Sequence, residues 1–259
     1  MPTLRPVTHL GLTAWLALTA AAVLAGFSKT AIGGAGAVAA AVAALVLPAR
    51  ASTGTILPLL ICGDVIAVSL YRRGANWRLM GRLAPWVLLG IGAGVVFLDR
   101  VRGNDAVRTT IAVLILAVLA THVAVGGRLR EHLAVRAART SAAQRAAAGL
   151  AGLAVGFTTM VANSAGAVMT VYLLLSGVTM LEFLGTGAWF FLAVNLIKLP
   201  FGVGLGLIDT GSLRTDALLL PGLVAGCALG RLLIRRIRPA SFERVVLGMA
   251  VVSAAVLLV

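Results

Sequence analysis

The stretch GFSKTAIGGAGAV, Gly26 to Val38, places one lysine and four glycines between two long apolar runs. A charged side chain is costly inside a membrane, and glycines weaken a helix. A second stretch, GFTTMVANSAGAV over residues 156–168, follows at an offset of 130 positions and ends in the same four residues. This pair of stretches indicates that the chain contains an internal duplication.

The composition predicts an integral membrane protein. Of the 259 residues, 60% are hydrophobic and 12% are charged, whereas a soluble domain is about half apolar and about a quarter charged. A helix of about 20 residues crosses the hydrocarbon core. Several apolar blocks are shorter, which predicts tilted, broken or re-entrant helices. The blocks cover residues 10–27, 30–47, 53–71, 83–98, 106–125, 146–161, 164–178, 183–207, 215–234 and 244–259.

Further matches between the halves predict a repeat of five segments. Because five is odd, the halves would insert with opposite orientations, as in the inverted repeats of secondary transporters. We therefore predict an all-α polytopic membrane protein with two inverted repeats. A single transmembrane domain over 1–259 would comprise a first repeat (10–127), a basic cytoplasmic connection (128–145) and a second repeat (146–259). The further matches are Gly54-Thr55 with Gly185-Thr186, Asp64 with Asn195, and PWVLLGIGAG (85–94) with PGLVAGCALG (221–230).

The arginines predict the orientation in the membrane. The formal charge is +14, and most arginines lie in three clusters between apolar blocks. Basic loops stay cytoplasmic in inner-membrane proteins, so we expect both termini on the outside. No basic face alternates with stacking aromatic residues, so nucleic-acid binding is not indicated. The clusters are Arg72, Arg73, Arg78 and Arg82; Arg128, Arg130, Arg136, Arg139 and Arg145; and Arg231, Arg235, Arg236, Arg238 and Arg244.

The broken segments predict an anion site between the halves. Irregular backbone at membrane depth is tolerated where it is buried in protein or lines a wet cavity. A helix that restarts at the glycines points its N-terminal amides into that cavity. Lys29 adds a positive charge, and Asn195 and Lys198 share one helix face. The predicted substrate-binding residues are Ser28, Lys29, Gly33, Gly34, Asn163, Ser164, Asn195 and Lys198.

Other interpretations of this region remain open at the level of sequence. The glycines are also compatible with helix packing alone, and Lys29 with an interfacial position in which its stem snorkels. GAGAVA (34–39) fits the dinucleotide fingerprint G-x-G-x-x-A. That motif needs a preceding strand and a later acidic residue, and here the flanks are membrane-length apolar blocks.

Asp64 lies deep within an apolar block, where an ionised side chain is costly. It is either a structural partner of Lys29 or of a backbone amide, or a proton-coupling carboxyl group whose charge follows substrate occupancy. Lys198 is likewise either a substrate ligand or the cation that neutralises Asp64.

These residues together resemble the sulfite exporter TauE/SafE family of bacterial inner-membrane permeases. The resemblance rests on residues 26–68 and their weaker echo at 156–200, and it covers nearly the whole chain. It implies transport of small sulfur-containing anions such as sulfite or organosulfonates, coupled to a proton or ion gradient. The site residues above are inferred from the pattern of this chain and not from the family.

The expectation is a secondary transporter in the bacterial cytoplasmic (inner) membrane, with Asp64 as the proton-coupling group. A passive anion channel and a non-transporting membrane subunit of a complex are the alternatives. No Ser/His/Asp set, paired carboxylate or metal-ligand spacing indicates an enzyme, and no cofactor is expected. The expected partners are a small anionic substrate and the lipid bilayer, without nucleic acid, and a homo-oligomer is compatible with the sequence.

Overall fold

Every element in the described part of the chain is a helix, as predicted. The structure is a computed structural model that describes residues 11–31, 35–47, 49–101, 103, 105–107, 109–110, 113, 141–163 and 165–237. The predicted blocks 106–125 and 244–259 lie largely or wholly outside these residues. The helices are α1 (Leu12–Thr30), α2 (Ala35–Val46), α3 (Ala49–Thr55), α4 (Leu57–Tyr71), the short 3-10 helix η2 (Arg72–Gly74), α5 (Trp77–Arg100), α8 (Ser141–Ala162), α9 (Gly166–Leu175), α10 (Met180–Gly204) and α11 (Thr210–Arg236).

Five helical stretches of the described residues are long and apolar enough to cross a membrane: 12–30, 52–74, 77–100, 180–204 and 210–236. By contrast, α2 and α9 have 12 and 10 residues. They are roughly 18 and 15 Å long, about half the thickness of the hydrocarbon core. Neither crosses it alone. Large apolar side chains stay exposed on the outside of the molecule, where lipid would cover them: Leu12, Leu16, Leu89, Leu150, Leu218 and Leu232.

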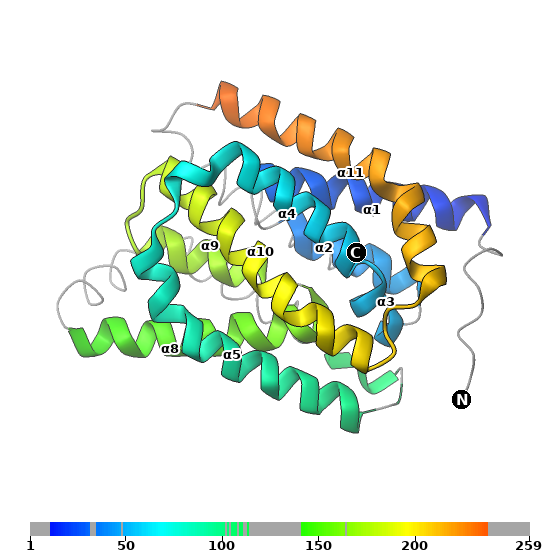
Figure 1. Cartoon of the computed structure of the whole chain (residues 1–259), viewed down its shortest axis with the longest axis horizontal. Coiled ribbons are helices and arrows are strands. Elements are labelled where there is room, and N and C mark those ends of the chain that lie inside the picture. The colour runs from blue at the N-terminus through cyan, green and yellow to red at the C-terminus, as the bar shows by residue number, and fades with distance from the viewer. Residues whose placement is uncertain are drawn as a thin grey trace.

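The long helices run in two opposite directions. In Figure 1, α1, α4 and α11 run from right to left, whereas α5, α8 and α10 run from left to right. The arginine-rich ends therefore gather at one end of the molecule. Arg72 and Arg73 follow the end of α4, Arg235 and Arg236 close α11, and Arg145 lies in the first turns of α8. This clustering agrees with the arginine pattern of the sequence.

A close crossing joins α1 to α11, and glycines make it possible. A Cβ atom on Gly26 would lie 2.1 Å from the carbonyl oxygen of Leu223, and one on Gly226 would lie 2.0 Å from that of Val23. Any other residue would push the two backbones apart. The Thr30 hydroxyl, which ends α1, also donates a hydrogen bond of 2.8 Å to the Cys227 carbonyl oxygen.

The crossing of α5 and α8 repeats these contacts. A Cβ atom on Gly156 would lie 2.2 Å from the carbonyl oxygen of Val87, and one on Gly90 would lie 2.4 Å from that of Leu153. In the sequence alignment the contacts of the two crossings are equivalent. Gly26–Leu223 matches Gly156–Val87, and Val23–Gly226 matches Leu153–Gly90. The first helix of each predicted half thus packs on the last described helix of the other.

Between these crossings, α4 and α10 pack antiparallel to each other. Gly185, near the start of α10, lies against Gly74, just after α4, and Gly202, near the end of α10, lies against Leu57 at the start of α4. Pro200 does not end α10, which continues to Gly204. The short helices α2 and α9 contact each other and border the same space as α4 and α10.

The equivalent crossings predict equivalent sensitivity to an added methyl group. Gly226→Ala and Gly90→Ala are each expected to lower the free energy of unfolding by about 1–3 kcal/mol, because overpacking forces the helices apart. Gly92→Ala is the matched control, since it also lies on α5 and no atom would come within 4 Å of its Cβ. Unfolding in detergent would measure all three, and equal stability of Gly226→Ala and Gly92→Ala would contradict the close crossing.

Candidate functional site

Lys29 on α1 and Asp64 on α4 form a buried ion pair. The Lys29 Nζ lies 2.6 Å from Asp64 Oδ1, and the side chains are 12% and 0% exposed. The ammonium group also lies 4.9 Å from the ring centre of Phe191 on α10, a cation–π contact. Because both charges are removed from water, each compensates the desolvation of the other.

Asn195 on α10 connects this ion pair to the second half. Its Nδ2 donates a hydrogen bond of 2.6 Å to Asp64 Oδ2, and the residue is only 2% exposed. Asp64 and Asn195 are aligned residues of the two halves. The helices α4 and α10 therefore meet at residues that the alignment of the two halves of the sequence makes equivalent.

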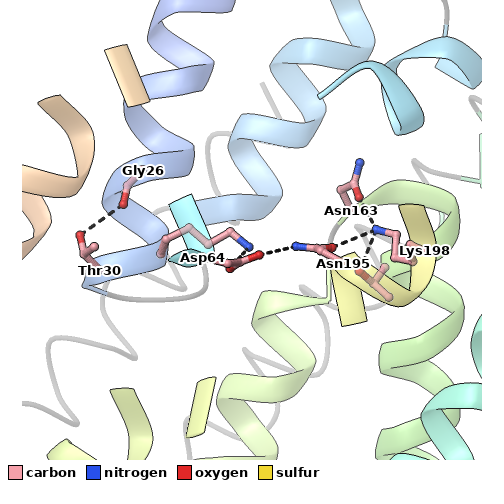
Figure 2. Close-up of polar contacts among 8 residues, drawn as sticks. Gly26, Thr30, Asp64, Asn163, Asn195 and Lys198 are labelled. Carbon is pink, nitrogen blue, oxygen red and sulfur yellow. Dashed lines mark hydrogen bonds and ion pairs between the residues drawn. The ribbon is translucent and has the colours of Figure 1, made fainter. Parts of the chain in front are cut away.

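Lys198 lies one helical turn after Asn195 and is also buried. Its Nζ donates to Asn163 Oδ1 at 2.5 Å, to Thr159 Oγ1 at 3.2 Å and to Asn195 Oδ1 at 3.4 Å. Three neutral oxygens thus accept the three donors of the ammonium group. Figure 2 shows Asp64, Asn195 and Lys198 in one row of polar contacts, with Asn163 at its end.

Asn163 lies in the break between α8 and α9. Its φ of +50° is in the left-handed region, which asparagine adopts more readily than most residues. Its Nδ2 donates to the carbonyl oxygen of Thr53 at 2.7 Å, and the Thr53 hydroxyl donates to the carbonyl oxygen of Val161 at 3.0 Å. The break in the second half is therefore attached to α3 of the first half.

A cavity adjoins the row of polar side chains. Its volume is about 80 Å³, several times the roughly 10–15 Å³ that one ordered water needs. Apolar side chains from α1, α2, α4, α9 and α10 form most of its wall. Its polar lining includes Ser28, Lys29, Asp64, Thr159, Asn163 and Asn195. Lys198 lies behind this lining, where it holds three of these side chains in place.

The charges of this site suit a small anion. With both lysines protonated and Asp64 ionised, the formal charge of the cluster is one positive unit. Gly166, the first residue of α9, also lines the cavity, and the free amides of a helix N-terminus favour negative charge. Within the described residues no group of three or more His, Cys, Asp or Glu side chains could hold a metal ion.

A comparison with protein-family models decides the class of the protein. The model described as "Sulfite exporter TauE/SafE" matches residues 18–257. The chain belongs to the TauE/SafE family. This confirms the resemblance stated from the sequence, and it makes the protein a member of a family of membrane transporters. Comparisons with curated proteins and with solved structures give no match.

The structure brings most of the predicted site residues of this TauE/SafE protein together. Ser28, Lys29, Asn163 and Asn195 line one cavity with Asp64, and Lys198 is bonded to two of them. The remaining predicted ligands lie outside the described residues: Gly33, Gly34 and Ser164.

Two alternative interpretations are wrong. Lys29 does not snorkel at the interface, because it forms an ion pair with Asp64. Lys198 makes no direct ion pair with Asp64, because Asn195 stands between them, but the two charges still interact. The dinucleotide fingerprint lacks its strand, since the helix α1 precedes it.

Sequence reasoning missed two contributors to the site. Thr159 accepts a hydrogen bond from Lys198 and lines the cavity. It is aligned with Lys29 at the offset of 130, so the repeat itself carried the signal. The second contributor is the carbonyl oxygen of Thr53, which accepts a hydrogen bond from Asn163. Every residue has such a main-chain oxygen, so the sequence gives no sign of its role.

The buried ion pair predicts a difference between single and double substitutions. Lys29→Met alone is expected to lower the free energy of unfolding by about 3–5 kcal/mol, because Asp64 is left buried without a cation. Adding Asp64→Asn removes that charge and keeps an acceptor for Asn195, so most of the stability should return. Unfolding in detergent measures both variants. A double variant no more stable than Lys29→Met would contradict the pairing.

Proposed function

We propose that this protein is a secondary transporter for small sulfur-containing anions such as sulfite or an organosulfonate. The observation that carries the proposal is the buried row from Lys29 to Lys198 beside a cavity between the halves. A net positive charge at membrane depth is costly unless an anion offsets it. Sulfite and sulfonate groups present several acceptor oxygens, which match the lysine, amide and hydroxyl donors of the lining.

Asp64 couples anion binding to proton binding in this proposal. When Asp64 is ionised, it pairs with the Lys29 ammonium group, whose Nζ lies 2.6 Å from Asp64 Oδ1. A proton on Asp64 neutralises the carboxylate and releases Lys29 to bind an anion. Proton and anion therefore bind together, and departure of the anion favours departure of the proton.

We further propose that the two halves form an inverted repeat and that α2 and α9 are the inner arms of re-entrant hairpins. The opposite directions of α1 and α8 support the inversion (Figure 1), as do the equivalent glycine crossings. In such transporters the site lies where the repeats meet, and rocking of one repeat against the other alternates access to it. Here that place is the contact of Asp64 with Asn195.

The proposed location is the bacterial inner membrane, with the basic helix ends in the cytoplasm. Lys/Arg-rich connections are retained on that side of the membrane. The described basic ends, with Arg72, Arg73, Arg235 and Arg236, lie at one end of the helix bundle.

The first rival is a passive anion channel, which would use the same cations for selectivity. A channel predicts flux that ignores both the proton gradient and the substitution Asp64→Asn. The second rival is a membrane subunit that acts only through a partner. It predicts that the purified protein alone carries no anion.

The proposal predicts that Lys29→Ala abolishes anion flux. In proteoliposomes, uptake of labelled sulfite and of ethanesulfonate is expected to fall by about thirtyfold or more, the equivalent of about 2 kcal/mol lost with a buried charge partner. Arg78→Ala is the control, because Arg78 is an exposed cation on α5 outside the cavity. Wild-type flux in a correctly inserted Lys29→Ala protein would remove Lys29 from the mechanism.

Coupling has its own test. Acid on the side that supplies ethanesulfonate is expected to accelerate wild-type uptake, because the proton and the anion enter the site together. Ethanesulfonate stays a monoanion, so the effect cannot come from titration of the substrate. In Asp64→Asn the site is permanently neutral at this position, and uptake should no longer respond to the pH gradient. An unchanged response in this variant would exclude Asp64 as the coupling group.

A further inference from the structure

Asp216 on α11 is a second buried carboxyl group, which the site above does not use. The residue is 5% exposed, and neither of its carboxylate oxygens has a hydrogen-bond partner. Within the described residues, no lysine or arginine forms an ion pair with it. An ionised carboxylate without a partner is costly in such a place, whereas the neutral acid is tolerated far better.

The groups that surround Asp216 compensate a charge there only in part. On α4, the backbone N–H of Leu59 in the first turn interacts with the carboxylate and favours its charged form, and Cys62 is the titratable side chain that interacts with it. On α1, Lys29 is the one described cation, and it already forms an ion pair with Asp64. The third helix against α11 is α3, which carries Arg50, whose side chain lies outside the described part.

Asp216 is a neighbour of two residues of the cavity wall, on the side away from the basic helix ends. Leu219, one helical turn after Asp216, lines the cavity, and so does Leu59, its neighbour on α4. Leu59 precedes Asp64 by five residues of α4, a rise of roughly 7–8 Å. Asp216 lies in the first third of α11, whereas Arg235 and Arg236 close its other end. Leu59 and Leu219 thus separate Asp216 from the cavity that Asp64 lines.

We propose that Asp216 is a second proton-binding site, which exchanges a proton with Asp64 and with the face of the membrane opposite the basic helix ends. The inference rests on the proposed function, because it supplies the path for the proton that Asp64 carries. The cavity has room for several waters, and in this proposal they relay the proton past Leu59 and Leu219, which separate Asp216 from the cavity.

The transfer step conserves charge. The O–H bond of the Asp216 acid breaks, a cavity water accepts that proton, and the water passes a proton to the Asp64 carboxylate. Asp216 is left as a carboxylate and Asp64 becomes a neutral acid. Lys29 then loses its ionic partner and binds the anion. Asp216 regains a proton from the outer face and returns to its neutral form.

The test compares net transport with exchange for the substitution Asp216→Asn. Exchange of labelled for unlabelled ethanesulfonate at equal pH needs no release of the proton, so it should stay close to wild type. Net uptake driven by a pH gradient should fall by at least about tenfold, the low side of the effect of removing a positioned proton-transfer group. Asp216→Glu should recover part of the net uptake. Asp99→Asn is the matched control, because Asp99 is an exposed carboxylate on α5.

Retained exchange in Asp216→Asn would show that the variant is folded. Wild-type net uptake in Asp216→Asn, still coupled to the pH gradient, would overturn the proton site and leave the proposed function intact. Equal loss of exchange and net uptake in both Asp216→Asn and Asp216→Glu would also overturn it, because a structural role explains that result.

A second measurement tests whether Asp216 is protonated, and it does not depend on transport. Dicyclohexylcarbodiimide modifies protonated carboxyl groups in apolar surroundings, and peptide mass spectrometry locates the adduct. Asp216 of the wild-type protein should be modified, more strongly at acidic than at alkaline pH, whereas Asp99 should not. If the wild-type protein carried no anion, the proposed function would fail and this labelling would still judge the site. Absence of an adduct at Asp216, or protection of it by Na⁺, would overturn the assignment.

Discussion

A charge that leaves water needs compensation, and this requirement ties the two halves of the protein together. Asp64 compensates Lys29 within the first half, and Asn195 of the second half supplies Asp64 with a further donor. Asn195 in turn accepts from Lys198 through its carbonyl oxygen. Each member depends on the next, so the network acts as a unit. Asp64 and Asn195, which connect α4 to α10, therefore also line the cavity.

The position of Lys198 separates electrostatic attraction from direct contact. Because it lies behind the lining, its charge reaches the cavity through Thr159, Asn163 and Asn195. Their side-chain oxygens accept from Lys198, so they present to a bound ion only the N–H and O–H donors that their other partners leave unused. In the proposed site, an anion would be attracted by the charge of Lys198 without contacting it directly. A transporter needs this balance, because a ligand held too tightly does not leave.

The sequence predicted the residues of the site better than their pairing. Asp64 and Lys198 are conspicuous because each is a charge inside an apolar block, and Lys29 because it lies between two of them; the alignment of the halves predicts that the blocks meet. Spacing does not say which neighbouring helix a side chain faces, so either lysine was a credible partner of Asp64. The packing of α1 against α4 decides for Lys29. Asp216 escaped notice because it lies near the start of an apolar block, and its burial becomes visible only when the other helices pack against α11.

The packing of α1 on α11 has a consequence for how the protein is made. The helix α1 ends at Thr30, but its partner begins only at Thr210, so the ribosome delivers the two far apart in time. Until then the small-residue groove around Gly26 must rest against lipid or the insertion machinery. The packing of α1 is therefore completed late, when α11 arrives, and a chain that stops before Thr210 leaves the groove around Gly26 unfilled.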